Sequence, residues 1–141
     1  MTFLRGHWCP FCRLHAHALA QMHERAAATG GQIVAITPER QSYTRRQKAE
    51  AGAGFKVLSD IDNGYALSLN LAIWIDTGMQ TILKDYGRDL AVYQATASWF
   101  VPIPATFIVA RDATITARFV DPDYSRRMDG DNLIAALQAA G

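Results

Sequence analysis

The sequence is poor in cysteine, in long apolar runs and in excess charge of either sign. Two cysteines among 141 residues are too few for the disulfide scaffold on which small secreted domains depend. No apolar run approaches the ~20 residues of a membrane-spanning helix, and no secretory signal is found, so we expect a cytoplasmic protein with no membrane partner. The 14 basic residues are balanced by 13 acidic ones, which disfavours nucleic acid as a partner.

The composition is that of a folded protein. Hydrophobic residues make up 50% of the chain and charged residues 19%, which excludes an intrinsically disordered protein. A length of 141 residues suits one globular core. No internal repeat, low-complexity stretch or linker divides the chain, so residues 1–141 are predicted to form a single domain.

Hydrophobic periodicity predicts an alternation of strands and helices. Phe11, Leu14 and Ala18 begin a series at three- and four-residue steps, which is typical of a helix with one apolar face. The run 32–37 is rich in β-branched residues, as in a buried parallel strand. The expected elements are a strand end at 2–5, a helix over 11–28, a strand over 32–37, a solvated helix over 39–52, a strand over 55–58, a short helix within 63–74, a helical insertion over 79–95, strands over 106–110 and 115–120, and a last helix capped by Asp131.

These elements predict an α/β fold with a mixed central sheet. The short turn between the last two strands indicates an antiparallel hairpin, whereas the first strands are separated by helices and are expected to be parallel. Helices flanking such a sheet make a layered sandwich. Glu39 and Glu50 lie among the basic residues of 39–52, and no series of aromatic residues accompanies them, so this segment is interpreted as a solvated face.

Cys9 and Cys12 lie in one four-residue stretch, where a strand is predicted to give way to a helix. Backbone N–H groups and the positive end of the helix dipole stabilise a thiolate at such a position. The spacing of three brings the second thiol to the first helical turn, so that one cysteine can resolve a mixed disulfide on the other. Arg5 and His7 are candidates for electrostatic support, and Pro10 suits the first turn. The pattern predicts a redox-active pair of thiols.

Two other interpretations of the cysteines are open. One is a buried structural pair without reactivity. The other is a metal site in which Cys9, Cys12 and His15 are joined by His7 or His17. A structural zinc needs four well-placed ligands, but there is no second cysteine pair, and His15 and His17 point to different sides of one helix. We therefore expect no metal and no other cofactor.

The segment 3–12, with the letters FLRGHWCPFC, resembles the FxRGxWCPxC signature of peroxiredoxin-like proteins. These proteins belong to the alkyl hydroperoxide reductase/thiol-specific antioxidant (AhpC/TSA) family of the thioredoxin-fold superfamily. The resemblance continues in the family's order through 33–39, 57–60, 102–107 and 121–127, and so covers essentially the whole chain.

This resemblance implies a thioredoxin-like three-layer sandwich with a mixed central sheet. It also implies a thiol–disulfide oxidoreductase or thiol-dependent peroxidase that acts on a peroxide or a disulfide. Thioredoxin or a glutathione-type thiol would recycle the oxidised protein. The residues expected to shape the site around Cys9 and Cys12 are Trp8, Pro10, Phe11 and Pro104.

The chain departs from the family's peroxide-binding pattern. Typical members carry Pro-x-x-x-Thr/Ser-x-x-Cys and a later arginine. Neither cysteine reproduces that motif, and Pro104 stands where the arginine is expected. The missing hydroxyl and guanidinium are groups that would stabilise charge on the leaving oxygen. Pro104 instead resembles the cis-proline of thioredoxins, with an ordinary trans proline as the alternative.

The roles of the two thiols have two assignments. The peroxiredoxin alignment makes Cys12 the attacking thiol and Cys9 the resolving one. The thioredoxin precedent reverses them, because the first cysteine of such a motif is generally the more exposed. Tyr124, Arg126 and Arg127 are expected to be structural or interfacial.

A second functional class is a non-catalytic thioredoxin-like module that binds a partner or senses redox state. The absent peroxide-activating residues favour it, as does the short stretch before the cysteine motif, which is longer in the family. Apolar surface that a longer stretch would cover is left either for a homodimer contact or for the rest of a longer gene product.

Overall fold

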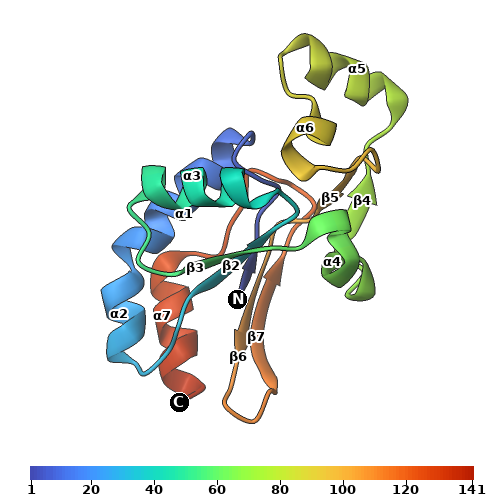
Figure 1. Ribbon diagram of the computed structural model, residues 1–141. Helices are drawn as coiled ribbons and strands as arrows, with labels where there is room; N and C mark the ends of the chain where they lie inside the picture. The colour runs from blue at the N-terminus through green and yellow to red at the C-terminus, as the bar shows by residue number, and fades with distance from the viewer.

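The chain is described by a computed structural model of residues 1–141, in which five strands form the main sheet in the order β3-β2-β1-β6-β7 (Figure 1). β1 (Thr2–Phe3), β2 (Val34–Thr37) and β3 (Lys56–Ser59) are parallel. β6 (Ala105–Val109) runs antiparallel to β1 and to β7 (Ile115–Val120). The expected mixed sheet and its edge hairpin are confirmed.

The main core joins the sheet to the helices α1 (Pro10–Gln21), α2 (His23–Ala28), α3 (Gln41–Ala51) and α7 (Gly130–Ala139). β1, β2 and β3 follow one another across the sheet, so right-handed crossovers place α1 and α3 on the same face. The other face carries the short η1 (Ile61–Asn63) and α4 (Gly64–Ser68). The thioredoxin-like sandwich is confirmed, with its third layer reduced to these short helices.

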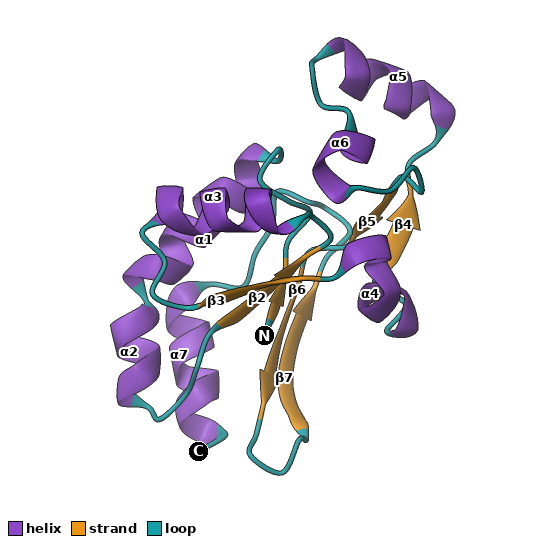
Figure 2. Ribbon diagram, viewed as in Figure 1, coloured by secondary structure: helices purple, strands orange, loops and turns teal.

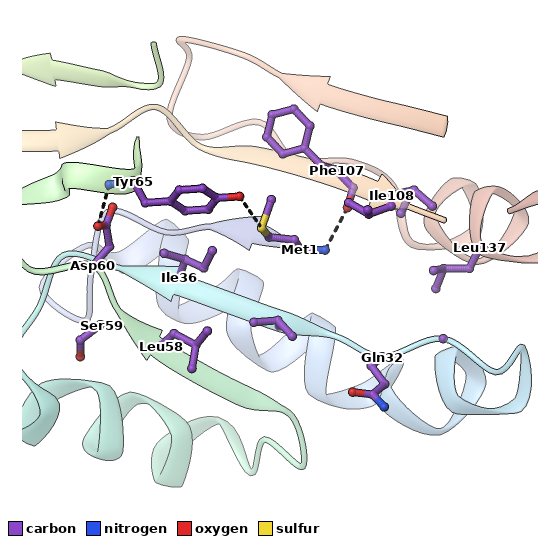
Figure 3. Close-up of a pocket in the computed structure, with 13 residues that line it drawn as sticks. Met1, Gln32, Ile36, Leu58, Ser59, Asp60, Tyr65, Phe107, Ile108 and Leu137 are labelled. Atoms are coloured by element: carbon purple, nitrogen blue, oxygen red, sulfur yellow. Dashed lines mark hydrogen bonds between the residues drawn. The ribbon is translucent and has the colours of Figure 1, made fainter. Parts of the chain in front are cut away.

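The thinly covered face of the sheet contains an apolar hollow of about 580 Å³ (Figure 3). Side chains alternate along a strand, so Ile36 of β2 faces this hollow while Ala35 faces the helical core. The Tyr65 hydroxyl donates a hydrogen bond to Met1 Sδ at 3.9 Å, and the Met1 amine donates one to the Phe107 carbonyl at 2.9 Å. The cysteines do not line this hollow.

A second, two-stranded sheet carries a small helical lobe (Figure 2). β4 (Ala72–Trp74) pairs antiparallel with β5 (Phe100–Pro102). Between them the chain forms α5 (Thr77–Asp85) and α6 (Leu90–Gln94). This lobe, defined as residues 72–102, projects from the end of the sheet at which α1 begins (Figure 1).

Local differences from the expected elements have identifiable causes. The helix expected over 11–28 is divided at Met22, which closes α1 and opens α2. The segment expected to be a short helix and its exit ends in β4, and the sequence predicts no strand at β5, because three-residue strands carry too little periodicity to stand out. The last helix is capped by Asp129 and not by Asp131: the Asp129 carboxylate accepts hydrogen bonds from the N–H groups of Asp131 and Asn132.

The cis-proline expectation for Pro104 is wrong, because every peptide bond in the structure is trans. Pro104 leads directly into β6, where Ala105 pairs with both Phe3 and Val120, and a trans bond continues that extended chain. None of the helices has the length and apolarity needed to cross a bilayer.

Candidate active site

Cys9 is the residue that caps the N-terminus of α1, immediately after the turn that follows β1. Its backbone is extended, with φ −91° and ψ 117°, and Pro10 occupies the first helical position. The Cys9 carbonyl accepts the first helical hydrogen bonds from the N–H groups of Cys12 and Arg13, both at 3.1 Å. The predicted placement of the motif at a strand–helix junction is confirmed.

The pKa of the Cys9 thiol is lowered from 9.0 to about 6. The largest cause is a hydrogen bond from the Cys12 thiol, followed by the backbone N–H of Cys12, the positive charge of Arg5 and the backbone N–H of Phe11. Burial opposes the shift, because Cys9 is only 2% exposed. The balance makes Cys9 a thiolate at neutral pH, which is the nucleophilic form.

Cys12 has the opposite properties. Its side chain is fully buried, and its pKa is raised because its thiol donates to Cys9, because it is desolvated and because the Cys9 thiolate repels a second negative charge. Two groups partly offset this: the Arg5 backbone N–H, 3.3 Å from Cys12 Sγ, and the Arg127 guanidinium, whose Nη2 is 3.5 Å from it. Cys12 is therefore a thiol held beside a thiolate.

Arg5 is held by two aromatic rings. Its guanidinium carbon lies 5.2 Å from the centre of the Trp8 ring and 4.7 Å from that of Tyr124, within the range of cation–π attraction. The Trp8 indole N–H donates to the Arg5 carbonyl at 3.2 Å, and Phe11 packs edge-to-face on Tyr124 at 5.6 Å. Arg5 is thereby fixed where its charge acts on Cys9.

A cleft of about 430 Å³ opens beside Cys9. Cys9 lines it and Cys12 does not. One wall comes from the segment between β1 and α1, the start of α1 and the loop after β7, and the other comes from β4, α5 and the turn after α5. The main lining side chains of the first wall are Arg5, Trp8, Phe11 and Tyr124, and those of the second are Trp74, Met79, Leu83 and Arg88.

A buried carboxyl group lies behind the motif. Glu39 is fully buried after β2, and its Oε2 accepts a hydrogen bond from the His7 N–H at 2.8 Å. Burial raises the Glu39 pKa to about 7, and the nearby Cys9 charge adds to the rise. The expectation that Glu39 belongs to a solvated helix is wrong, because the helix begins two residues later and the carboxyl turns inward.

His7 does not join the thiols. Its Nε2 lies 2.7 Å from Oε2 of Glu50 on α3, and its ring stacks near Tyr43. His15 is buried, with Nε2 3.5 Å from the Thr2 hydroxyl, and burial together with the Arg127 charge lowers its pKa to about 3. No cluster of three or more His, Cys, Asp or Glu side chains with metal-binding geometry occurs in the structure.

The structure brings several of the expected residues together and adds others. Trp8, Pro10, Phe11 and Arg5 lie at the cleft, whereas Pro104 does not line it. The sequence does not predict three residues of the site. Tyr124 and Arg127 are expected to be structural or interfacial, and their only signal is a position in the segment 121–127, which follows the family's order but does not show which side chain approaches the thiols. Glu39 is expected on a solvated face.

Comparisons with known proteins show the family and the fold of this chain. A family model described as the AhpC/TSA family matches residues 1–118. Among solved structures, a cysteine-to-serine mutant of Xanthomonas campestris peroxiredoxin Q is similar over 99% of this chain and 77% of its own, with 14% identity and a TM-score of 0.72. Reduced Prx3 from Vibrio vulnificus in complex with H₂O₂ is similar over 96% and 76%, with 13% identity and a TM-score of 0.73. Peroxidoxin BcpB from Mycobacterium tuberculosis is similar over 98% and 76%, with 14% identity and a TM-score of 0.71. No curated protein matches the chain significantly.

Proposed function

This chain belongs to the AhpC/TSA family, and we propose that it acts as a thiol-dependent oxidoreductase whose redox centre is the pair Cys9 and Cys12. One observation carries the proposal: Cys9, the thiol with the lowered pKa, lines a cleft, and the buried thiol of Cys12 lies in the first turn of the helix that Cys9 begins. Of the two role assignments, this arrangement supports Cys9 as the attacking thiol and Cys12 as the resolving thiol.

With a hydroperoxide, the first step is attack of the Cys9 thiolate on one peroxide oxygen. A sulfur–oxygen bond forms, the oxygen–oxygen bond breaks, and the leaving alkoxide takes a proton from solvent to become an alcohol. Cys9 is left as a sulfenic acid. Arg5, fixed between Trp8 and Tyr124, provides a positive charge next to the reacting sulfur.

The second step closes the disulfide. The Cys12 sulfur attacks Cys9, its thiol proton and the sulfenic hydroxyl leave together as water, and a Cys9–Cys12 bond forms. With a disulfide substrate, the same attack by Cys9 gives a mixed disulfide and releases one thiolate, and Cys12 then releases the second thiol. The Arg127 guanidinium beside Cys12 favours the thiolate that this step needs.

A reductant completes the cycle by two thiol–disulfide exchanges, in which the two sulfurs of Cys9 and Cys12 gain two electrons and two protons from a dithiol or from two thiols. We propose a cytoplasmic protein with residues 1–141 as one domain, recycled by thioredoxin or a glutathione-type thiol. A homodimer contact over the apolar hollow is part of this proposal.

Turnover of single-cysteine variants tests the function. Hydrogen peroxide, an organic hydroperoxide and a model disulfide are each supplied with a dithiol reductant to wild type, Cys9→Ser and Cys12→Ser. We expect Cys9→Ser to be inactive in every assay and Cys12→Ser to lose turnover while still being oxidised once. Equal activity of all three proteins would show that turnover does not depend on the two cysteines and would overturn the proposal. No activity in wild type would favour the non-catalytic binding or redox-sensing module.

A further inference from the structure

The cleft beside Cys9 has walls of different origin. Cys9 lies on the wall made by the core, and Arg88 lies on the wall made by the lobe, in the turn after α5. We propose that this cleft binds a small organic molecule with an apolar body and a carboxylate, and that Arg88 holds the carboxylate. This inference rests on the proposed redox function only for the reaction of the opposite end of that molecule with Cys9.

The apolar body is indicated by the lobe wall. Trp74 is 52% exposed and Met79 45% exposed, although both are large apolar side chains that gain by leaving water. Leu83 and Ile73 belong to the same wall, and Phe11 lines the cleft from α1. A volume of about 430 Å³ falls in the range of roughly 300–1,000 Å³ that small-molecule sites occupy.

The carboxylate is indicated by the charges of the cleft. Arg88 is half-buried and forms no ion pair in the structure. The acid of the cleft, Asp76, caps α5 by accepting the Met79 N–H at 3.0 Å. The second arginine, Arg5, is stacked between aromatic rings and acts on Cys9. Arg88 therefore has free donors, and a carboxylate is the planar anion that a guanidinium binds with two hydrogen bonds.

The position of Cys9 favours a small molecule over a protein in this cleft. Only 2% of Cys9 is exposed, so a reacting group has to enter the cleft to come within about 3–3.5 Å of the sulfur. A molecule held at Arg88 on the lobe wall extends its other end toward the core wall, where Cys9 lies.

Two sources of this chemistry fit the same contacts. The molecule is either the oxidant, as a hydroperoxide that gives up one oxygen to Cys9 and leaves as the alcohol, or the reductant, as a dithiol that opens the Cys9–Cys12 disulfide and closes its own. Both have an apolar chain and a carboxylate, so binding is tested first and the source second.

Binding is tested on the reduced protein with octanoate and, as the uncharged counterpart, octanamide. Calorimetry gives the affinity, and protection of Cys9 from alkylation by iodoacetamide places the ligand at the cleft and not in the apolar hollow. We expect octanoate to bind at least about tenfold more tightly than octanamide. Arg88→Gln should abolish this difference, Arg88→Lys should restore part of it, and Arg45→Gln, a change of an exposed arginine on α3, should leave it intact.

The source is tested by rates under single turnover. One arm compares oxidation of the protein by linoleic acid hydroperoxide and by its methyl ester, and the other compares reduction of the disulfide by dihydrolipoate and by dihydrolipoamide. If one of these reactions is faster with the carboxylate than with its uncharged counterpart, and Arg88→Gln removes the difference, that reaction identifies the bound molecule as the oxidant or the reductant and supports the proposal. Equal binding of octanoate and octanamide, or a preference that survives Arg88→Gln, overturns it, whether or not the cysteine variants confirm the redox function.

Discussion

Arg127 Nη2 lies 3.5 Å from Cys12 Sγ, although 115 residues separate the two in the chain. The guanidinium lowers the pKa of a thiol that burial and the Cys9 thiolate otherwise raise. The loop after β7 therefore closes over the same helix turn that carries the motif, and it supplies the positive charge nearest to the resolving sulfur.

Arg127→Gln should slow disulfide closure. Loss of the cation raises the Cys12 pKa further, so less thiolate is present to attack oxidised Cys9. We expect closure at neutral pH to be about three- to tenfold slower, because a change of one pKa unit alters the thiolate fraction up to tenfold. Quenched-flow oxidation followed by mass spectrometry measures the step. Arg126→Gln, which removes an arginine paired with Asp121, is the control and should close at the wild-type rate.

Arg5→Gln should make Cys9 less acidic. In wild type the alkylation rate of Cys9 should rise with pH, with a midpoint near the pKa of about 6. Without the Arg5 charge, the midpoint should move up by roughly half to one pH unit. Alkylation of the Cys9 peptide by iodoacetamide, followed from about pH 5 to pH 9, gives the midpoint. An unchanged midpoint in Arg5→Gln, or a shift of equal size in the control Arg13→Gln, would show that the Arg5 charge has no specific effect on the Cys9 pKa.

Glu39 makes stability fall as pH rises. Its pKa increases from 4.5 in the unfolded chain to about 7 in the folded protein, so the folded protein holds an extra proton between these values. This group's contribution to stability is full below pH 4.5 and is lost as pH rises through 7.

Glu39→Gln cannot titrate at this position, so its stability relative to wild type should be greater at about pH 8 than at about pH 5, by roughly 2.5 kcal/mol for a pKa shift of this size. Urea unfolding at both pH values measures the difference. The exposed control Glu24→Gln should follow wild type throughout. A Glu39→Gln protein whose stability runs parallel to wild type with pH would show that this carboxyl titrates normally.

Gly6 is required by both its backbone and its contact with Glu39. Its φ is +137°, and an added Cβ would lie 2.6 Å from the Glu39 carboxyl. Gly6→Ala should therefore destabilise the protein by more than about 2 kcal/mol. Gly52→Ala, at φ +62° with open space around the Cβ position, should cost only about 1 kcal/mol. Urea unfolding measures the stability of both variants. An equal loss of stability in the two would mean that the backbone around residue 6 adjusts to the added Cβ.

Local patterns predicted most of the fold. The Cys9–Cys12 motif at a helix start and the hairpin of β6 and β7 each depend on residues close together in sequence, and both are present. β4 and β5 are three-residue strands that pair although the whole segment 75–99 separates them, so no local period marks them.

The missing parts of the site have a different cause. Glu39 is a charged residue in a polar segment, which predicts a solvated position, whereas its burial depends on the turn at Gly6, which belongs to another segment. Arg127 and Tyr124 come from a loop whose path is set by tertiary packing, so the sequence marks them as charged and aromatic but does not show that they meet Cys12 and Arg5.

Trapping the first oxidation product tests most directly whether Cys9 attacks and Cys12 resolves. One equivalent of hydroperoxide is added to wild type, Cys9→Ser and Cys12→Ser, dimedone is used to trap sulfenic acid, and peptides are identified by mass spectrometry. A Cys9–Cys12 disulfide in wild type, a dimedone adduct on Cys9 in Cys12→Ser and no adduct in Cys9→Ser are the expected results. An adduct on Cys12 in Cys9→Ser, with none on Cys9 in Cys12→Ser, would contradict these roles and make Cys12 the attacking thiol.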